Sequence, residues 1–333
     1  MARVSMLEPP LASASARLGP EFGQRVLLTI DTEEEFDWGA PFRRDGYGLS
    51  HVTAIPRFQS FCEKIGAHPV YLVDWPIAND ARAVEIIGDA VRRGTADVGA
   101  QLHPWVNPPF DEELCVRNSF AGNLPQALEA AKLMALCDGI ERAFGTPPLI
   151  YRAGRYGLGP NTAALLKSAG IRIDTSVRTL FDYSSQDGPD YTRHPLAPYW
   201  VDKERELLEL PVTSVYSGLL HNVGRQLQQV GERLPRAMGA LSRLGLLERI
   251  ALTPEKVSIK EALRGIDIAL DTGLPVLVLS FHSPTLAPGH TPYSVTEDNV
   301  EALYDWFEQV YTALHRRGVR SCTVADIIAA SGG

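Results

Sequence analysis

Short apolar runs alternate along the chain with longer segments of helical periodicity, and this alternation constrains the fold more than any other feature. The apolar, β-branched runs predict strands at residues 25–31, 68–74, 96–103, 148–154, 171–177, 207–216, 274–282 and 320–327. The segments between them predict helices at residues 58–66, 83–94, 124–145, 161–170, 258–273 and 296–318. Seven or eight strand–helix repeats favour a parallel α/β barrel over an open doubly wound sheet.

The domain organisation follows from the same pattern. The chain has 333 residues, of which 45% are apolar, enough for one full core. We expect a flexible leader at residues 1–24 and a single barrel domain over residues 25–330. Residues 217–252 depart from the rhythm, because arginines alternate there with leucines. This segment predicts an amphipathic helical insertion that caps one barrel end, or alternatively a lid or a docking surface for a membrane or an anionic glycan.

Charge and composition exclude several classes of protein. The net charge of -8 provides no basic field for nucleic acid. No apolar run approaches the ~18 residues that a membrane span requires. The four cysteines lack any CxxC spacing, which favours reduced thiols. Because the first 20 residues also lack the apolar core of a signal peptide, we expect a cytoplasmic protein.

Titratable residues follow the ends of most predicted strands. In parallel α/β folds the carboxyl ends of the strands open onto one common mouth, where catalytic groups gather. The residues at these positions are Asp31, Glu33, Glu34, Glu35, Asp74, His103, Arg152, Arg155, Asp174 and His282. Any single one has an ordinary structural alternative, such as a helix cap or a rim ion pair. Their coincidence at one end of the barrel favours a functional site.

The chemistry of such a cluster indicates hydrolysis. Carboxylates crowded at one place repel each other and need a cation nearby. A divalent metal held by carboxylate and imidazole would neutralise them and activate a water molecule. A further carboxylate would accept the proton of that water, and a histidine on the opposite wall would protonate the leaving group. This combination predicts cleavage of an amide or an ester.

Five stretches resemble the motifs of a known family. They are TIDTEEEF, GAQLHPW, YRAGRYG, IDTSV and LSFHSPTLAPGHTPY, and they resemble the motifs of the polysaccharide deacetylase family in order and spacing, over residues 25–327. The resemblance is greatest to a branch associated with bacterial cell-wall, lipopolysaccharide and exopolysaccharide gene clusters. It implies a distorted (β/α)7 barrel, a divalent metal, and removal of N- or O-acetyl groups from amino sugars.

The resemblance also implies roles for individual residues. Asp31, which follows Thr29 and Ile30, matches the general base of the first motif. Arg152 matches the arginine that orients this base, with Arg155 as a second candidate. Asp174 matches the acid that tunes the catalytic histidine, and His282 matches that histidine, the general acid.

The metal ligands depart from the family pattern. The family places an aspartate where this chain has Thr32, so we assign that ligand role to Glu33. The family also has two histidines four residues apart, whereas here only His103 is present, with Gln101 two residues before it on the same strand face. An amide oxygen binds zinc poorly and suits manganese, magnesium or calcium better. The ion is therefore zinc or one of these harder metals, and a protein without metal is the alternative.

Aromatic residues near the same rim predict a sugar site. Flat rings stack on the apolar face of a pyranose, although packing at the barrel end is an equal alternative. The substrate-binding residues predicted in this way, with the arginine of the same motif, are Trp38, Trp75, Trp105, Arg155 and Tyr156.

Together these observations predict a metal-assisted hydrolase. We expect it to remove acetyl groups from a glycan or glycolipid intermediate of bacterial envelope polysaccharide synthesis. One alternative is a catalytically inactive deacetylase-like protein that binds glycans. Another is a hydrolase of a different C–N bond, or of a glycosidic bond through Asp31 and a second carboxylate.

Overall fold

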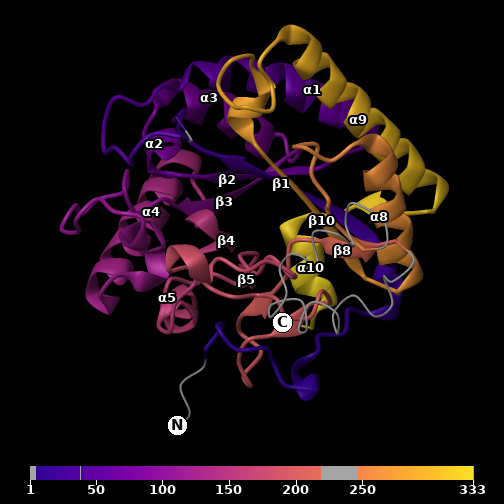
Figure 1. Ribbon diagram of the computed structural model, residues 1–333, viewed down its shortest axis with the longest axis horizontal. Coiled ribbons are helices and arrows are strands. Elements are labelled where there is room, and N and C mark those ends of the chain that lie inside the picture. Colours follow the sequence, from indigo (N-terminus) through magenta and orange to yellow (C-terminus); the bar gives the residue numbers. More distant parts are fainter. Residues whose placement is uncertain (1–4, 38, 219–246, 333) are drawn as a thin grey trace.

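The computed structural model describes residues 5–37, 39–218 and 247–332, and its strands curl around a centre with helices outside them (Figure 1). The strands are β1 (Arg25–Thr32), β2 (Pro69–Val73), β3 (Asp97–Leu102), β4 (Ile150–Ala153), β5 (Ile173–Asp174), β6 (Tyr199–Trp200), β7 (Leu208–Glu209), β8 (Ser214–Ser217), β9 (Glu248–Ala251), β10 (Val276–His282) and β11 (Arg320–Ser321). The α-helices are α1 (Ile55–Ile65), α2 (Trp75–Ala78), α3 (Ala81–Arg92), α4 (Gln126–Phe144), α5 (Thr162–Ser168), α8 (Ile259–Asp271), α9 (Glu297–Arg316) and α10 (Val324–Ala330).

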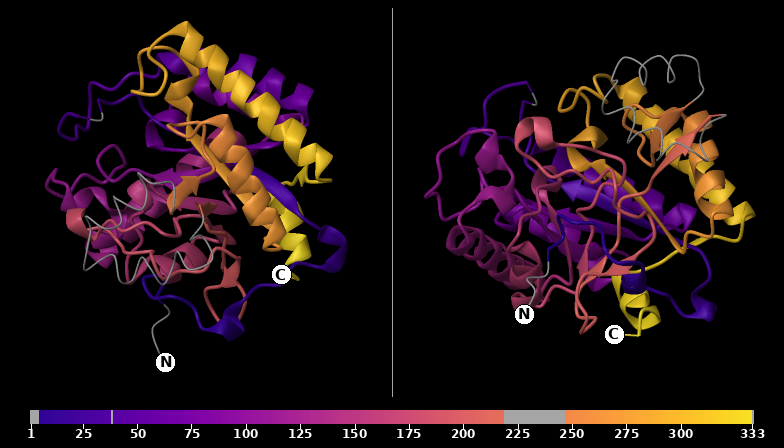
Figure 2. Two further views of the ribbon diagram at one scale, coloured as in Figure 1. Left: turned by 45° about the vertical axis from the view of Figure 1, so that its right-hand side comes forward. Right: turned by 60° about the horizontal axis from the view of Figure 1, so that its bottom comes forward.

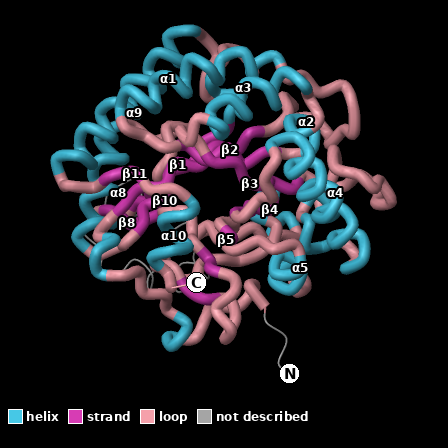
Figure 3. The backbone as a smooth tube through the Cα atoms, turned by 180° about the vertical axis from the view of Figure 1, so that it is seen from behind, coloured by secondary structure: helices cyan, strands magenta, loops and turns pink. Residues whose placement is uncertain are grey.

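One curled sheet forms the barrel. Its order is β10-β1-β2-β3-β4-β5-β7-β6, with β11 beside β1, and its pairs are parallel except for β6 with β7. The segment after β7 reaches back to β10, where the N–H of Thr213 donates to the carbonyl of Val278 at 3.3 Å and its hydroxyl accepts from the N–H of Val278 at 2.8 Å. Seen from behind, the strands surround the centre and the helices form the outer layer (Figure 3). The predicted α/β barrel is confirmed as a distorted (β/α)7-type barrel.

Strand periodicity divides the core into two apolar layers, because successive side chains point to opposite faces. The inner layer contains Leu27, Val70, Leu72, Ile150, Ile173, Leu208, Val276 and Val278. The outer layer, which packs against the helices, contains Val26, Leu28, Ile30, Tyr71, Val73, Tyr151, Leu277, Leu279 and Phe281. Val324 and Ile327 of α10 join the inner layer and close the barrel at the amino ends of the strands.

The described part of the leader is packed rather than free. Met6 is 1% exposed, and its carbonyl lies 3.1 Å from Nε2 of His194. Phe22 joins the inner layer, and the N–H of Gly19 donates to the carbonyl of Ala330 at 2.9 Å. Two views show the segment that follows the amino terminus and the carboxyl-terminal helix at the same end of the molecule (Figure 2). Residues 5–24 therefore contact the barrel at several points, and the flexible leader stays a prediction.

Two strand predictions need correction. The run 207–216 forms two strands instead of one, because Pro211 lies between β7 and β8 and has no N–H to donate to a ladder. The run 320–327 is a strand only over β11. Thr323 then starts α10 with a capping box, in which Thr323 and Asp326 each accept from the other's N–H.

The predicted insertion is described only at its ends. Ser217 belongs to β8, which pairs with β9 in an antiparallel ribbon, so both flanks are strands rather than the helix we expected. Residues 219–246, with the proposed lid or membrane contact, lie outside the described residues. Within the described ranges, no helix is long and apolar enough to cross a membrane.

Candidate active site

Four predicted site residues lie on the inner face of the barrel, near the carboxyl ends of their strands. Asp31, Arg152 and His282 follow the inner apolar residues by an even number of positions, and Gln101 lies beside Arg152 in the sheet. All four line one cavity of about 570 Å³. The even spacing therefore turns polar groups from four strands into the same space.

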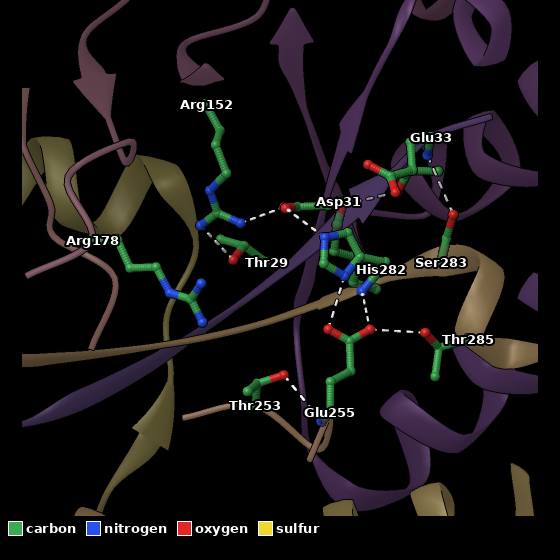
Figure 4. A network of polar contacts seen from close by, with 12 residues as sticks. Thr29, Asp31, Glu33, Arg152, Arg178, Thr253, Glu255, His282, Ser283 and Thr285 are labelled. Atoms are coloured by element: carbon green, nitrogen blue, oxygen red, sulfur yellow. Dashed lines mark hydrogen bonds and ion pairs between the residues drawn. The ribbon is translucent and has the colours of Figure 1, made fainter. Parts of the chain in front are cut away.

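Arg152 fixes the carboxylate of Asp31. Its side chain is fully buried and its Nη1 donates to Oδ1 of Asp31 (Figure 4). Nη2 donates to the hydroxyl of Thr29 at 2.9 Å, and Nε donates to the carbonyl of Thr175 at 3.0 Å. Because every nitrogen of the guanidinium has an acceptor, the arginine holds Asp31 in one orientation.

His282 lies opposite Asp31 on the neighbouring strand. The two residues are in register between β1 and β10, and Nε2 of His282 is 3.8 Å from Oδ2 of Asp31. Glu255 accepts from the backbone N–H of His282 at 3.0 Å, and its other oxygen lies 2.8 Å from Nδ1. Burial alone would lower the pKa of His282, but the carboxylates of Glu255, Glu33 and Asp31 outweigh it and raise the pKa to about 10. The imidazole is therefore charged at neutral pH and has a proton to donate.

Asp174 does not have the position expected for the acid that tunes His282. It pairs with Tyr151, whose side chain belongs to the outer layer, and it does not line the cavity. Its carboxylate accepts from the hydroxyl of Ser176 at 2.7 Å. Burial raises the pKa of Asp174 and of its neighbour Glu209, so this buried pair favours a singly protonated form. Glu255, rather than Asp174, lies beside Nδ1 of His282 and raises its pKa.

The three predicted metal ligands, Glu33, Gln101 and His103, also line the cavity. Nε2 of His103 is 3.4 Å from Oε2 of Glu33. Oε1 of Glu33 and Oε1 of Gln101 are buried without a hydrogen-bond partner among the described residues. Burial lowers the pKa of His103 to about 4, which keeps its imidazole neutral and its free nitrogen available. Burial also raises the pKa of Glu33, and a bound cation would return that carboxyl to its charged form. This donor set fits a divalent metal.

A second group of side chains with possible ligand atoms surrounds His103. Glu34, Asp74 and His103 have such atoms within 4.8 Å of one another. Oε1 of Glu34 accepts from Nε1 of Trp105 at 2.6 Å, and Oε2 of Glu34 lies 3.0 Å from Nδ1 of His103. Asp74 accepts from the N–H groups of Ile77 and Glu34. Because these carboxylates are already hydrogen-bonded, we interpret them as the groups that orient His103 rather than as ligands.

The predicted sugar-binding residues have different fates. Arg155 and Tyr156 line the cavity. Trp105 also lines it but is only 3% exposed and stacks on the His103 ring at 4.3 Å, so it mainly orients that histidine. Trp75 does not line the cavity and lies against Gly139 of α4, which corrects our prediction for it. Trp38 lies outside the described residues.

Arg178 and Glu255 are among the cavity residues that the sequence analysis missed. Arg178 follows β5, so the same search for charged residues after strands would have included it. Glu255 follows β9, in a segment that we assigned to the region after a helical insertion. No local pattern marks Glu255, because its place depends on how β9 pairs with β8 and returns to β10.

Comparison with solved structures identifies the fold. A candidate polysaccharide deacetylase from Mycobacterium smegmatis superposes with a TM-score of 0.50 at 16% identity, over 95% of this chain and 98% of its own. A family 4 carbohydrate esterase from Streptomyces lividans gives 0.44 at 11% identity, over 91% and 94%. A CE4 family pseudoenzyme from Bacillus anthracis gives 0.46 at 9% identity, over 92% and 66%.

The first of these structures shows that the chain has the polysaccharide deacetylase fold. No protein-family model and no curated protein matches its sequence. The residues that fill the cavity, rather than the likeness, must therefore support any activity.

Proposed function

We propose that this protein is a metal-assisted hydrolase that removes an acetyl group, from nitrogen or oxygen, from a carbohydrate. We propose a glycan or glycolipid intermediate of bacterial envelope polysaccharide synthesis as its substrate, and the cytoplasm as its location. The observation that carries the proposal is the facing pair on β1 and β10. Asp31 is held by Arg152 and His282 is held by Glu255, beside the orphaned oxygens of Glu33 and Gln101.

The chain's own residues provide a base and an acid. Asp31, held in one orientation, accepts a proton from the water that attacks the acetyl carbonyl. His282, charged at neutral pH, donates a proton to the nitrogen or oxygen that leaves. A divalent metal held by Glu33, His103 and Gln101 would supply Lewis acidity, which polarises the carbonyl and lowers the pKa of water.

Activity measurements test the catalytic pair. We expect Asp31→Asn and His282→Ala each to lower kcat for acetate release by roughly 100-fold or more, the usual contribution of a positioned acid or base. Glu85→Gln, an exposed change on α3, serves as the control. Full activity in both site variants would refute the assignment, and release of shortened chains instead of acetate would indicate a glycosidase.

Metal analysis tests the ligand set without relying on activity. We expect the purified protein to contain a divalent ion in near-stoichiometric amount, and His103→Ala and Glu33→Gln to lose it. Elemental analysis after incubation with zinc, manganese, magnesium or calcium would identify the ion.

The second candidate function is glycan binding without catalysis. Gln101 favours it, because an amide replaces a stronger ligand at a position where its oxygen is buried and unpaired. A protein that binds an acetylated sugar, takes up no metal and releases no acetate would establish this alternative.

A further inference from the structure

The cavity is lined by both acidic and basic side chains. Asp31 and Glu33 are among the first, and Arg155 and Arg178 are among the second. Figure 4 shows the guanidinium of Arg178 directed toward the space beside Thr253 and Glu255. The mechanism above uses neither Arg178 nor Arg155, so their charges need another explanation.

Neither arginine is neutralised by a carboxylate within the part of the chain that the structure describes. Nη1 of Arg178 donates to the hydroxyl of Tyr183 at 3.3 Å, and its buried Nε has no partner. Arg155 donates to two neutral oxygens, those of Ser119 and Gln186. The nearby carboxylate of Glu255 is already engaged by His282 and Thr285. Both side chains are partly buried, and a buried guanidinium without a counter-charge is costly unless an anion joins it.

Aromatic rings hold the guanidinium of Arg178 in place. It lies 3.9 Å from the ring centre of Phe181 and 5.2 Å from that of Tyr156. Tyr156 and Tyr183 stack at 5.8 Å and continue the same wall. A guanidinium held by rings keeps its donor edge free for the planar, two-point recognition of a carboxylate or a phosphate.

The backbone that presents Arg155 is unusual. Arg155 and Tyr156 both have positive φ, 54° and 60°, although neither is a glycine. Consecutive left-handed residues of this kind are strained and are retained mainly at functional sites. Here the turn brings both side chains to the cavity wall.

We infer that the wall formed by Arg155, Tyr156, Arg178 and Tyr183 binds an oxyanion carried by the substrate, so that the protein acts on acidic sugars. That the substrate is a sugar rests on the proposed function. That the sugar bears an anion is inferred from the geometry of the wall. The oxyanion is a carboxylate, as in a uronic acid, or a phosphate, as in a sugar phosphate or a phosphate-linked glycolipid.

Binding measurements with matched sugars test the inference. The probes are N-acetylglucosamine, its 1-phosphate and N-acetylglucosaminuronic acid, titrated calorimetrically into the metal-loaded protein at low and high salt. We expect at least one acidic sugar to bind roughly 10- to 100-fold more tightly than the neutral one, the usual size of a charge-assisted contact. The acidic sugar that binds more tightly identifies the source of the anion. High salt should reduce the difference in affinity between the acidic and the neutral sugars, because it screens charge interactions.

Variants of the arginines provide the decisive comparison. Arg178→Gln and Arg155→Gln should each weaken binding of the acidic sugar far more than binding of the neutral sugar, and so remove most of the preference for the acidic one. Arg249→Gln is the matched control, since Arg249 lies 3.6 Å from the same Phe181 ring but does not line the cavity. If Arg178→Gln fails to fold, Arg155→Gln answers the question alone.

The outcomes separate this inference from the proposed function. Equal binding of all three sugars, no binding of any, or an equal effect of Arg249→Gln would overturn the inference. If acetate is released from neutral and acidic sugars with equal kcat/KM, and Arg178→Gln changes neither value, the hydrolase stands and the inference falls. If acidic sugars bind through Arg178 but no acetate appears, the inference stands and the hydrolase falls.

Discussion

At the scale of single residues, two carboxylates decide how the histidines of the centre are presented. Glu255 lies at Nδ1 of His282, and Glu34 lies at Nδ1 of His103. In both cases Nε2 is left to face the acidic groups of the cavity. The partner of one ring nitrogen fixes the orientation and the tautomer of the ring. Each carboxylate can therefore affect activity through its histidine without contacting the substrate.

The pH dependence of activity tests the role of Glu255. The carboxylates of Glu255, Glu33 and Asp31 raise the pKa of His282 to about 10 against the opposing effect of burial. Activity that needs protonated His282 is lost as pH rises through this pKa. Removing one carboxylate lowers the pKa, so we expect Glu255→Gln to shift the basic limb of kcat/KM downward by about one unit or more. The profiles of Glu255→Gln and Glu85→Gln should be compared, and coincident basic limbs would contradict this role.

At the scale of elements, the sequence predicts those helices and strands whose pattern of apolar residues lies within one continuous segment. The helices over α1, α3, α4, α5, α8 and α9 and the long strands follow from periodicity alone. Asp31, Arg152 and His282 are predictable because each lies at the carboxyl end of a clear apolar run. Asp174 is not, since β5 has only two residues, and only pairing with β4 shows that its side chain points outward. The position of Glu255 in the cavity depends on strand pairing between segments far apart in the sequence, and no local pattern predicts that pairing.

The turn after β4 makes a steric prediction. A Cβ added at Gly154 would lie 2.5 Å from Cδ2 of His103 and 2.5 Å from the carbonyl of Leu102. Because the carbonyl is backbone and cannot move aside cheaply, we expect Gly154→Ala to displace His103. Metal affinity measured by competition with a chelator should fall roughly 10-fold or more, as for other changes that disturb ligand orientation. Gly19→Ala, with only one atom nearby at 3.8 Å, should leave the affinity unchanged; an equal affinity in both variants would argue against a ligand role for His103.

The contact between α4 and α5 predicts a pH-dependent stability. Burial raises the pKa of Glu129 from 4.5 to about 7, where its carboxyl accepts from the hydroxyl of Thr162. The folded protein therefore holds a proton that the unfolded chain loses between these pH values. The free energy of unfolding falls as pH rises through this window, and Glu129→Gln removes that loss.

Urea denaturation at two pH values measures this effect. Relative to the wild type, we expect Glu129→Gln to be more stable by about 1–3 kcal/mol at pH 8 and nearly equal at pH 4.5. Glu141→Gln, an exposed change on the same helix, should show no such difference. A Glu129→Gln protein that is destabilised equally at both pH values would indicate that the carboxyl has a packing role instead.

At the scale of the whole molecule, the two ends of the barrel have separate tasks. The cavity lies at the carboxyl ends of the strands, where Asp31 and His282 stand. The amino ends are closed by α10 and by residues 16–22, which add Val324, Ile327 and Phe22 to the inner layer. The apolar inner layer lies between them, so a change at the closed end should reach the site only through global unfolding.

Ile327→Ala tests this separation. Ile327 is 0% exposed, and its truncation should lower the free energy of unfolding by about 2–5 kcal/mol, because it leaves a cavity where the apolar interior meets α10. Metal content and kcat at a temperature well below the melting transition should remain those of the wild type. The neighbouring Ile328, which is only partly buried, should cost less stability when changed to alanine. A lower kcat for Ile327→Ala in a protein that stays folded would contradict this separation. It would mean that a change of packing at the closed end alters the geometry of the site through the inner layer.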